Sequence, residues 1–184
     1  MTATGGVDTG RRPGVRVGST SEFSLFFRVT PGHAEELRKA LTALMDSPGY
    51  RPGDYEMAVA NIHEARFVMF DDDTRLLFAT SFDGSWDAYM EDFASAGPLK
   101  LFDAIFRHTE AYDGLPDVAA VKSFILGAQV SAGAYARNYP GTVKELRRAL
   151  RLEAAFDEVL DDPEAETALS HPALKPLLDE AADA

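Results

Sequence analysis

The sequence of 184 residues contains no cysteine. This absence excludes disulfide bonds, a thiolate nucleophile and any metal site with cysteine ligands. The four histidines show no HxH or HxxxH spacing, so no metal site is predicted. A phosphate-binding glycine loop is also missing, because the glycine-rich stretch GGVDTG near the N-terminus follows no predicted strand.

Basic residues are scarce: the chain has 18 Lys and Arg against 30 Asp and Glu, a formal net charge of -12 at pH 7. Such a surface repels phosphate backbones and anionic lipid headgroups, so neither nucleic acid nor a membrane is expected as a partner. No apolar run approaches the roughly 20 residues of a membrane-spanning helix, and the first residues lack an apolar signal core. We therefore expect a cytoplasmic protein.

What is present is the composition of an ordinary globular protein, with 46% hydrophobic and 26% charged residues. Residues 1–21 are rich in Gly, Thr and Arg and predict a disordered N-terminal tail. Residues 22–162 are expected to form a single α+β domain that includes a C-terminal helix. Residues 163–184 predict an acidic C-terminal tail whose leucines dock a short helix.

The strongest pattern is a β-hairpin over residues 62–83, in which two apolar runs flank the polar turn Asp71–Thr74. With that turn, Phe70 pairs with Arg75 and Phe67 pairs with Phe78. One face of the hairpin is apolar and suits a cover of helices; it carries His63, Ala65, Phe67, Met69, Leu76, Phe78 and Phe82. The other, here called the mixed face, carries Glu64, Arg66, Val68, Phe70, Leu77, Ala79, Ser81 and Asp83.

The remaining elements follow from periodicity and turn residues. Residues 23–29 predict a strand, with Phe26 and Arg28 on the side that matches the mixed face. Thr30-Pro31 predicts the start of a helix. Residues 47–61 form a long connection containing Tyr55, which is either a functional lid or a surface excursion. Helices are expected from Trp86, from Leu99 and from the capping box at 142–145, and a buried strand over 119–130.

The resulting order β-α-β-β-α-β, with extra C-terminal helices, predicts a ferredoxin-like fold with an antiparallel sheet. Over residues 23–130 the chain resembles the dimeric α+β-barrel superfamily, which includes cofactor-free monooxygenases, small polyketide-modifying enzymes and haem enzymes. The stretch IHEARFV…LLFATSFDGSWDAYMEDF is similar to uncharacterised bacterial proteins of this architecture. The apolar residues of the mixed face need a cover, and we expect a second copy of the chain in a homodimer, with the C-terminal helices as the alternative cover.

The charged residues of the mixed face are the candidates for chemistry. Glu64 and Arg66 are the catalytic candidates, with Glu64 as a base, in a pocket for a small hydrophobic, anionic or phenolic ligand. The substrate-binding candidates are Arg28, Phe26, Ser81, Asp83 and Tyr55. The alternative interpretation is a salt-bridged dimer interface, because ion-pair networks are often structural.

Three functions stay open at this stage. The first is a small-molecule enzyme or binding protein with its pocket between sheet and helices, such as a cofactor-independent oxygenase- or cyclase-like biosynthetic enzyme. The second is a haem protein, for which His108 is the one candidate axial ligand. The stretch 80–84 is similar to the GxxDG motif of dye-decolorising peroxidases, although Thr80 replaces the first glycine. The third is a structural or interaction dimer without catalysis. No cofactor is favoured.

Overall fold

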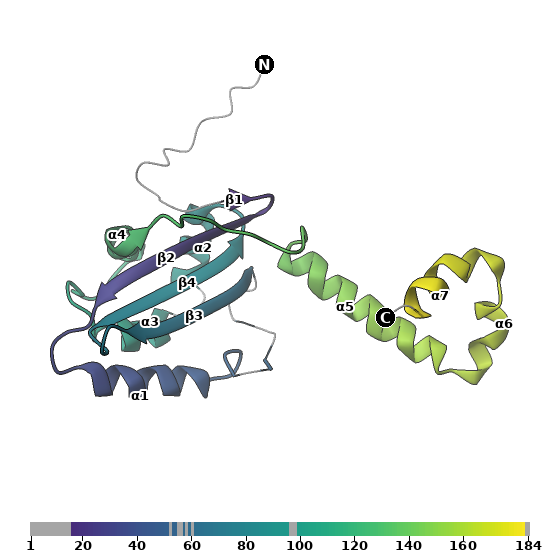
Figure 1. Cartoon of the computed structure of the whole chain (residues 1–184), viewed down its shortest axis with the longest axis horizontal. Helices are drawn as coiled ribbons and strands as arrows, with labels where there is room; N and C mark the ends of the chain where they lie inside the picture. Colours follow the sequence, from purple (N-terminus) through teal and green to yellow (C-terminus); the bar gives the residue numbers. More distant parts are fainter. Residues whose placement is uncertain are drawn as a thin grey trace, which may run out of the picture. The chain divides into compact units, whose positions relative to one another are not determined.

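The computed structural model describes residues 16–51, 53–54, 57, 59, 61–95 and 99–182. The chain divides into two compact units, Met1–Val143 and Lys144–Ala184. Within the described residues, the first unit contains an antiparallel sheet and four helices, and the second contains helical segments (Figure 1). The fold class is therefore α+β.

Three long strands form the centre of the sheet: β2 (Thr20–Arg28), β4 (Arg75–Asp83) and β3 (Ile62–Phe70). The short strands β1 (Arg16–Val17) and β5 (Gln129–Val130) both pair with β2, so the sheet has five strands in the order β1-β2-β4-β3 with β5 beside β2. Every pairing is antiparallel. β3 is consequently an edge strand.

The hairpin register is the one that the sequence predicts. Phe70 lies opposite Arg75 and Phe67 lies opposite Phe78. The turn between the strands places Asp71, Asp72 and Asp73 at φ values of 57°, 51° and 65°. This left-handed backbone crowds the Cβ atom of any residue except glycine, although Asp tolerates it better than most.

Replacing Asp72 with glycine is expected to raise the free energy of unfolding by about 0.5–1 kcal/mol, because the left-handed conformation then carries no Cβ penalty. Asp72→Ala is the matched control: it removes the same carboxylate but keeps a Cβ, and it is expected to lower stability. Urea denaturation of both variants checks this. A glycine variant no more stable than the alanine variant would show that the turn is unstrained.

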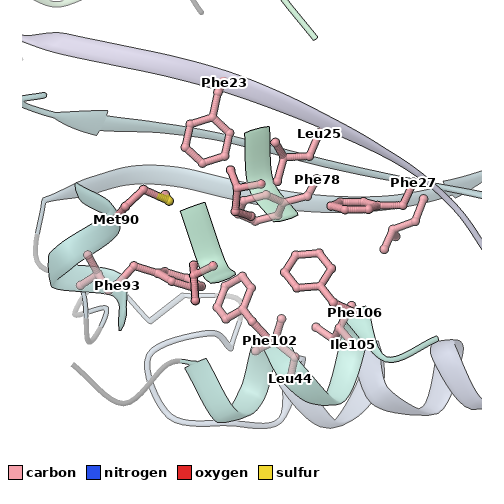
Figure 2. Close-up of a cluster of buried hydrophobic side chains, with 14 of the residues drawn as sticks. Phe23, Leu25, Phe27, Leu44, Phe78, Met90, Phe93, Phe102, Ile105 and Phe106 are labelled. Atoms are coloured by element: carbon pink, nitrogen blue, oxygen red, sulfur yellow. The ribbon is translucent and has the colours of Figure 1, made fainter. Parts of the chain in front are cut away.

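Four helices cover the apolar face of the sheet: α1 (Ala34–Met45), α2 (Trp86–Ser95), α3 (Leu99–Phe106) and α4 (Val118–Ala128). Figure 2 shows Phe102 and Phe106 of α3 directed toward Phe78 and Phe27 of the sheet. The Phe78 ring lies 5.6 Å from that of Phe102 and 6.4 Å from that of Phe106. This aromatic cluster is the centre of the core.

The helix from Trp86 has the predicted stripe, since Tyr89, Met90 and Phe93 are all buried. Trp86 itself is partly buried, and its Nε1 donates a hydrogen bond to Gln129 Oε1 at 3.1 Å. The stripe therefore attaches α2 to the core, and Trp86 connects α2 to β5.

The strand predicted over 119–130 is wrong, because Val118–Ala128 is helix α4 and only Gln129–Val130 is extended. Asp117 caps the helix by accepting a hydrogen bond from the backbone of Ala120 at 2.8 Å. Val121 and Ile125, four residues apart, are its buried positions. A run that is apolar at nearly every position does not distinguish a buried strand from a buried helix. The Asp117 side chain, which caps the first turn, favours the helix.

The expected placement of His63 on the apolar face is also wrong. The β3–β4 register shifts between Ile62 and Glu64, so that Ile62 pairs with Phe82 while Glu64 pairs with Ser81. This β-bulge adds one residue to β3 and reverses the direction of His63. Its side chain instead reaches Thr20 and Asp83, at the end of the mixed face.

The limits of the folded regions differ from the sequence-based expectation. Residues 16–21, expected in the tail, include β1 and the first residues of β2. Helix α5 (Val143–Leu160) lies almost wholly in the second unit and not in the α+β domain. Helices α6 (Glu166–Leu169) and α7 (Lys175–Ala182) follow it. Within the described residues, no helix is long and apolar enough to span a membrane.

Candidate functional site

A pocket of about 420 Å³ lies between α1, the edge strand β3, α3 and the connection that follows α1. Most of its lining is apolar, and a few polar side chains stand among the apolar ones. The lining residues are Leu41, Leu44, Met45, Gly49, Tyr50, Arg51, Asp54, Met57, Ala65, Arg66, Phe67 and Phe102. This is the combination that small-molecule sites usually have.

The local sequence explains why space remains there. Leu41, Leu44 and Met45 lie near the end of α1, and Phe67 and Phe102 contribute aromatic wall. Ala65, on the apolar face of β3, also lines the pocket, and its small side chain leaves space that a larger residue would fill. Because β3 has no strand beyond it in the described sheet, the connection after α1 is what closes this side.

One hydrogen bond joins that connection to the end of α1, and another lies within the connection. Arg51 Nε donates to the carbonyl oxygen of Asp46 at 2.9 Å, and Asp54 Oδ2 accepts from the backbone of Gly49 at 2.9 Å. Arg51 and Asp54 are therefore structural in part.

Two groups give the pocket a polar end. Burial raises the pKa of the Tyr50 hydroxyl, so Tyr50 is a neutral hydrogen-bonding group near pH 7. Its ring packs edge-to-face on Phe102 with centroids 6.5 Å apart. Arg66 makes no ion pair within the described part of the chain, and its guanidinium is available to an anionic group.

The structure brings together part of the predicted site. Glu64, Arg66 and Ser81 line a smaller cavity of about 180 Å³ on the mixed face, together with Glu22 and Tyr135. Glu64 and Arg66 are exposed, whereas Ser81 is buried. Arg66 lines both this cavity and the 420 Å³ pocket, and among the described candidates it is the predicted site residue that lines both.

Phe26 and Arg28 lie elsewhere. Arg28 is opposite Arg75 and lines a separate hollow with Glu110, whereas Ser81 is opposite Glu22. Arg66 is opposite Ala79, which is opposite Ser24, and the four residues of extended strand from position 24 to position 28 span about 13 Å. The expectation that Arg28 and Arg66 lie side by side is therefore wrong. The Phe26 ring packs on Phe70, 6.3 Å away. Tyr55 lies outside the described residues.

Asp83 belongs to a polar cluster at the opposite end of the sheet from Arg28. Its Oδ1 lies 2.7 Å from His63 Nε2 and accepts a hydrogen bond from Thr20 at 3.2 Å. Its Oδ2 accepts from the backbone of Val143 at 2.7 Å, at the first residue of α5. The His63 side chain is only 2% exposed. The cluster holds the irregular segment before α5 against the sheet.

Arg137 completes the cluster, and sequence reasoning missed it. It donates to Thr20 Oγ1 and to the carbonyl oxygen of Gly141 at 2.9 Å, and it lies 4.8 Å above the ring of Tyr139. Arg137 stands in a stretch without periodicity, so no pattern in the sequence marks it. In the stretch 80–84, Asp83 is occupied by the hydrogen bonds of this cluster.

His108 does not fit a haem ligand. Its Nδ1 lies 3.2 Å from His33 Nδ1, and neither the 420 Å³ pocket nor the 180 Å³ cavity contains it. Partial burial lowers the pKa of His108, and the neighbouring His33 and Arg107 lower it further. Among the described residues, no three His, Asp or Glu side chains are grouped as metal ligands.

Comparisons of the chain with protein-family models, with curated proteins and with solved structures found no match. The features of the molecule that bear on function are therefore the two cavities and the side chains that line them.

Proposed function

We propose that this protein binds a small molecule with an apolar body and an anionic or phenolic group in the pocket between α1 and β3. The observation that carries the proposal is the pocket itself. Its volume of about 420 Å³ lies within the roughly 300–1,000 Å³ typical of ligand sites. The apolar wall from Leu44 to Phe102 would hold the body, and Arg66 and Tyr50 would hold the polar group.

The smaller cavity supports a catalytic form of this proposal. Glu64 and Arg66 point to the same face of β3 and line that cavity with Ser81. In a cofactor-independent oxygenase- or cyclase-like reaction, Glu64 would take a proton from the substrate and Arg66 would stabilise the resulting enolate or phenolate oxygen. Such a substrate would have to reach Arg66 from the mixed face.

Arg66→Gln is expected to weaken the binding of an anilinonaphthalene sulfonate probe, which combines an apolar body with an anion, by about tenfold, because one charge-assisted hydrogen bond is lost. Arg75→Gln is the matched control, since Arg75 is an exposed arginine on the neighbouring strand outside the pocket. Fluorescence titration gives both affinities, and thermal melting checks that both variants fold.

A second variant tests the pocket without changing charge. Ala65→Leu adds volume to the wall and is expected to abolish probe binding. Equal affinities for the two arginine variants, or undiminished binding by a folded Ala65→Leu protein, would exclude this pocket as the site.

The ferredoxin-like topology and the dimeric barrel are part of the same proposal. The order β5-β2-β4-β3 and the helices on one face support the topology. On the mixed face Val68 is 41% exposed, and Phe26, Phe70 and Leu77 are partly exposed. A second copy of the chain is the proposed cover, because a solvated apolar sheet face favours association.

Val68→Asp is expected to raise the dissociation constant of the homodimer by about tenfold or more, because it places a carboxylate in the apolar centre of the proposed contact. Val17→Asp is the control, since Val17 is also a strand residue and is 39% exposed. Sedimentation velocity over a range of micromolar concentrations measures both constants. If the unsubstituted chain is a monomer throughout that range, the barrel arrangement is refuted.

A further inference from the structure

Helix α5 is exposed along most of its 18 residues. Leu152 is 67% exposed, Leu150 62% and Val159 42%. Val143 is buried, and Leu146 and Phe156 are partly buried, but most of the helix is open to water. Such a helix gains little of the packing of an apolar side from which most helical stability in proteins comes. α5 therefore has the properties of a helix that contacts a partner.

The apolar residues define one seam along the helix. Ala149, Leu152, Phe156 and Val159 follow one another at spacings of three, four and three residues, the spacing of the contact positions in a two-stranded coiled coil. The stripe on the opposite side of the helix, which contains Leu150, is interrupted by acidic residues at positions 153 and 157. The uninterrupted seam is thus the better contact surface.

The charges of α5 are divided between its two halves. The first half carries Lys144, Arg147, Arg148 and Arg151 with one acid, Glu145; positions 153–162 carry Glu153, Asp157, Glu158, Asp161 and Asp162 with no base. This order opposes the helix macrodipole, which favours acids near the N-terminus and bases near the C-terminus. An antiparallel helix of the same sequence reverses both effects, because it places acids beside bases and aligns opposite dipole ends.

We propose that α5 pairs antiparallel with α5 of a second copy of this chain through the seam Ala149, Leu152, Phe156 and Val159. In this register Leu152 lies opposite Phe156 of the partner subunit, and the two-fold axis passes near Ala154. A parallel pair would place like charges together at both ends. The inference is independent of the proposed function, since it needs neither the ligand pocket nor the contact through Val68.

Because the chain has no cysteine, a single introduced cysteine gives a unique spin-label site in the full-length protein. Lys144→Cys and Ala154→Cys lie outside the seam, near one end and at the centre of α5. At 1.5 Å per residue, the antiparallel pair separates the two labels at position 144 by about 30 Å along the axis, and those at position 154 by about 0 Å. Pulsed dipolar spectroscopy is expected to give a clearly longer distance for Lys144→Cys.

Leu152→Glu, added to each labelled chain, is expected to raise the dissociation constant read from the dipolar signal by about tenfold or more, because it puts a charge in the seam. Leu150→Glu is the matched control: the same substitution at similar exposure, on the opposite side of the helix. It is expected to leave the signal unchanged. Equal distances at both label sites, no distance between copies, or equal loss with both glutamates would each overturn the antiparallel pair.

Discussion

Phe78→Ala is expected to lower the free energy of unfolding by about 3–5 kcal/mol, the loss usual for a buried phenylalanine truncated to alanine. Phe78 is 2% exposed, and its ring lies within 6.4 Å of those of Phe23, Phe67, Phe102 and Phe106. These neighbours come from strands β2 and β3 and from helix α3. The cavity left by Phe78 therefore cannot be filled by the movement of one side chain.

Urea denaturation followed by circular dichroism measures this effect. Phe26→Ala is the control, because Phe26 belongs to the adjacent strand but faces the partly exposed side of the sheet. It is expected to cost about 1 kcal/mol, since less apolar surface leaves water there on folding. Equal losses for the two variants would contradict the assignment of the aromatic cluster as the centre of the core.

Asp83→Asn is expected to cost about 2–4 kcal/mol, although it preserves the shape of the side chain. The carboxylate accepts hydrogen bonds at both oxygens, from Thr20 and His63 at one and from the backbone of Val143 at the other. An amide has only one oxygen, so its NH₂ group must face a donor. The variant therefore leaves a donor of the cluster without an acceptor, whichever way the amide is turned.

Asp117→Asn provides the matched comparison. Asp117 also caps a helix, but it accepts a single hydrogen bond at the exposed start of α4. Asparagine caps helices about as well as aspartate, so a change below about 0.5 kcal/mol is expected. The melting temperatures of the two variants distinguish an aspartate that only caps a helix from one that holds a polar cluster together. Similar melting temperatures for both would show that Asp83 is only a cap.

The sequence predicts the hairpin and the stripe of α2 correctly because their side chains alternate or recur with a single period. Phe67 opposite Phe78 follows from the turn alone. α4 was predicted as a strand because nearly all of its residues are apolar, which removes the period that separates helix from strand. His63 was misplaced for another reason: a bulge is a property of backbone pairing, and one extra residue reverses the faces.

The candidate site was predictable only in part. Arg66 is correctly expected to line a cavity, because its strand position determines its face. The separation of Arg28 from Arg66 depends on the register between β2 and β4, strands that are far apart in the chain, and no local signal reports that register. Arg137 reaches Thr20 across 117 positions of sequence from an aperiodic segment. Contacts of this kind depend on the folded chain as a whole.

The two strand pairings of β4 join residues at very different separations in the sequence, and this difference affects the order in which the sheet assembles. A four-residue turn closes β3 on β4, whereas pairing of β2 with β4 brings Thr20 to Asp83 across 63 positions. Because the entropy lost on closing a loop grows with its length, the hairpin can form within microseconds, before β2 adds to it. β3 keeps a free edge even after β2 has docked, within the described sheet. Glu64 and Arg66, charged and exposed on that edge, hinder the addition of a strand from another molecule and so protect the folding chain from aggregation.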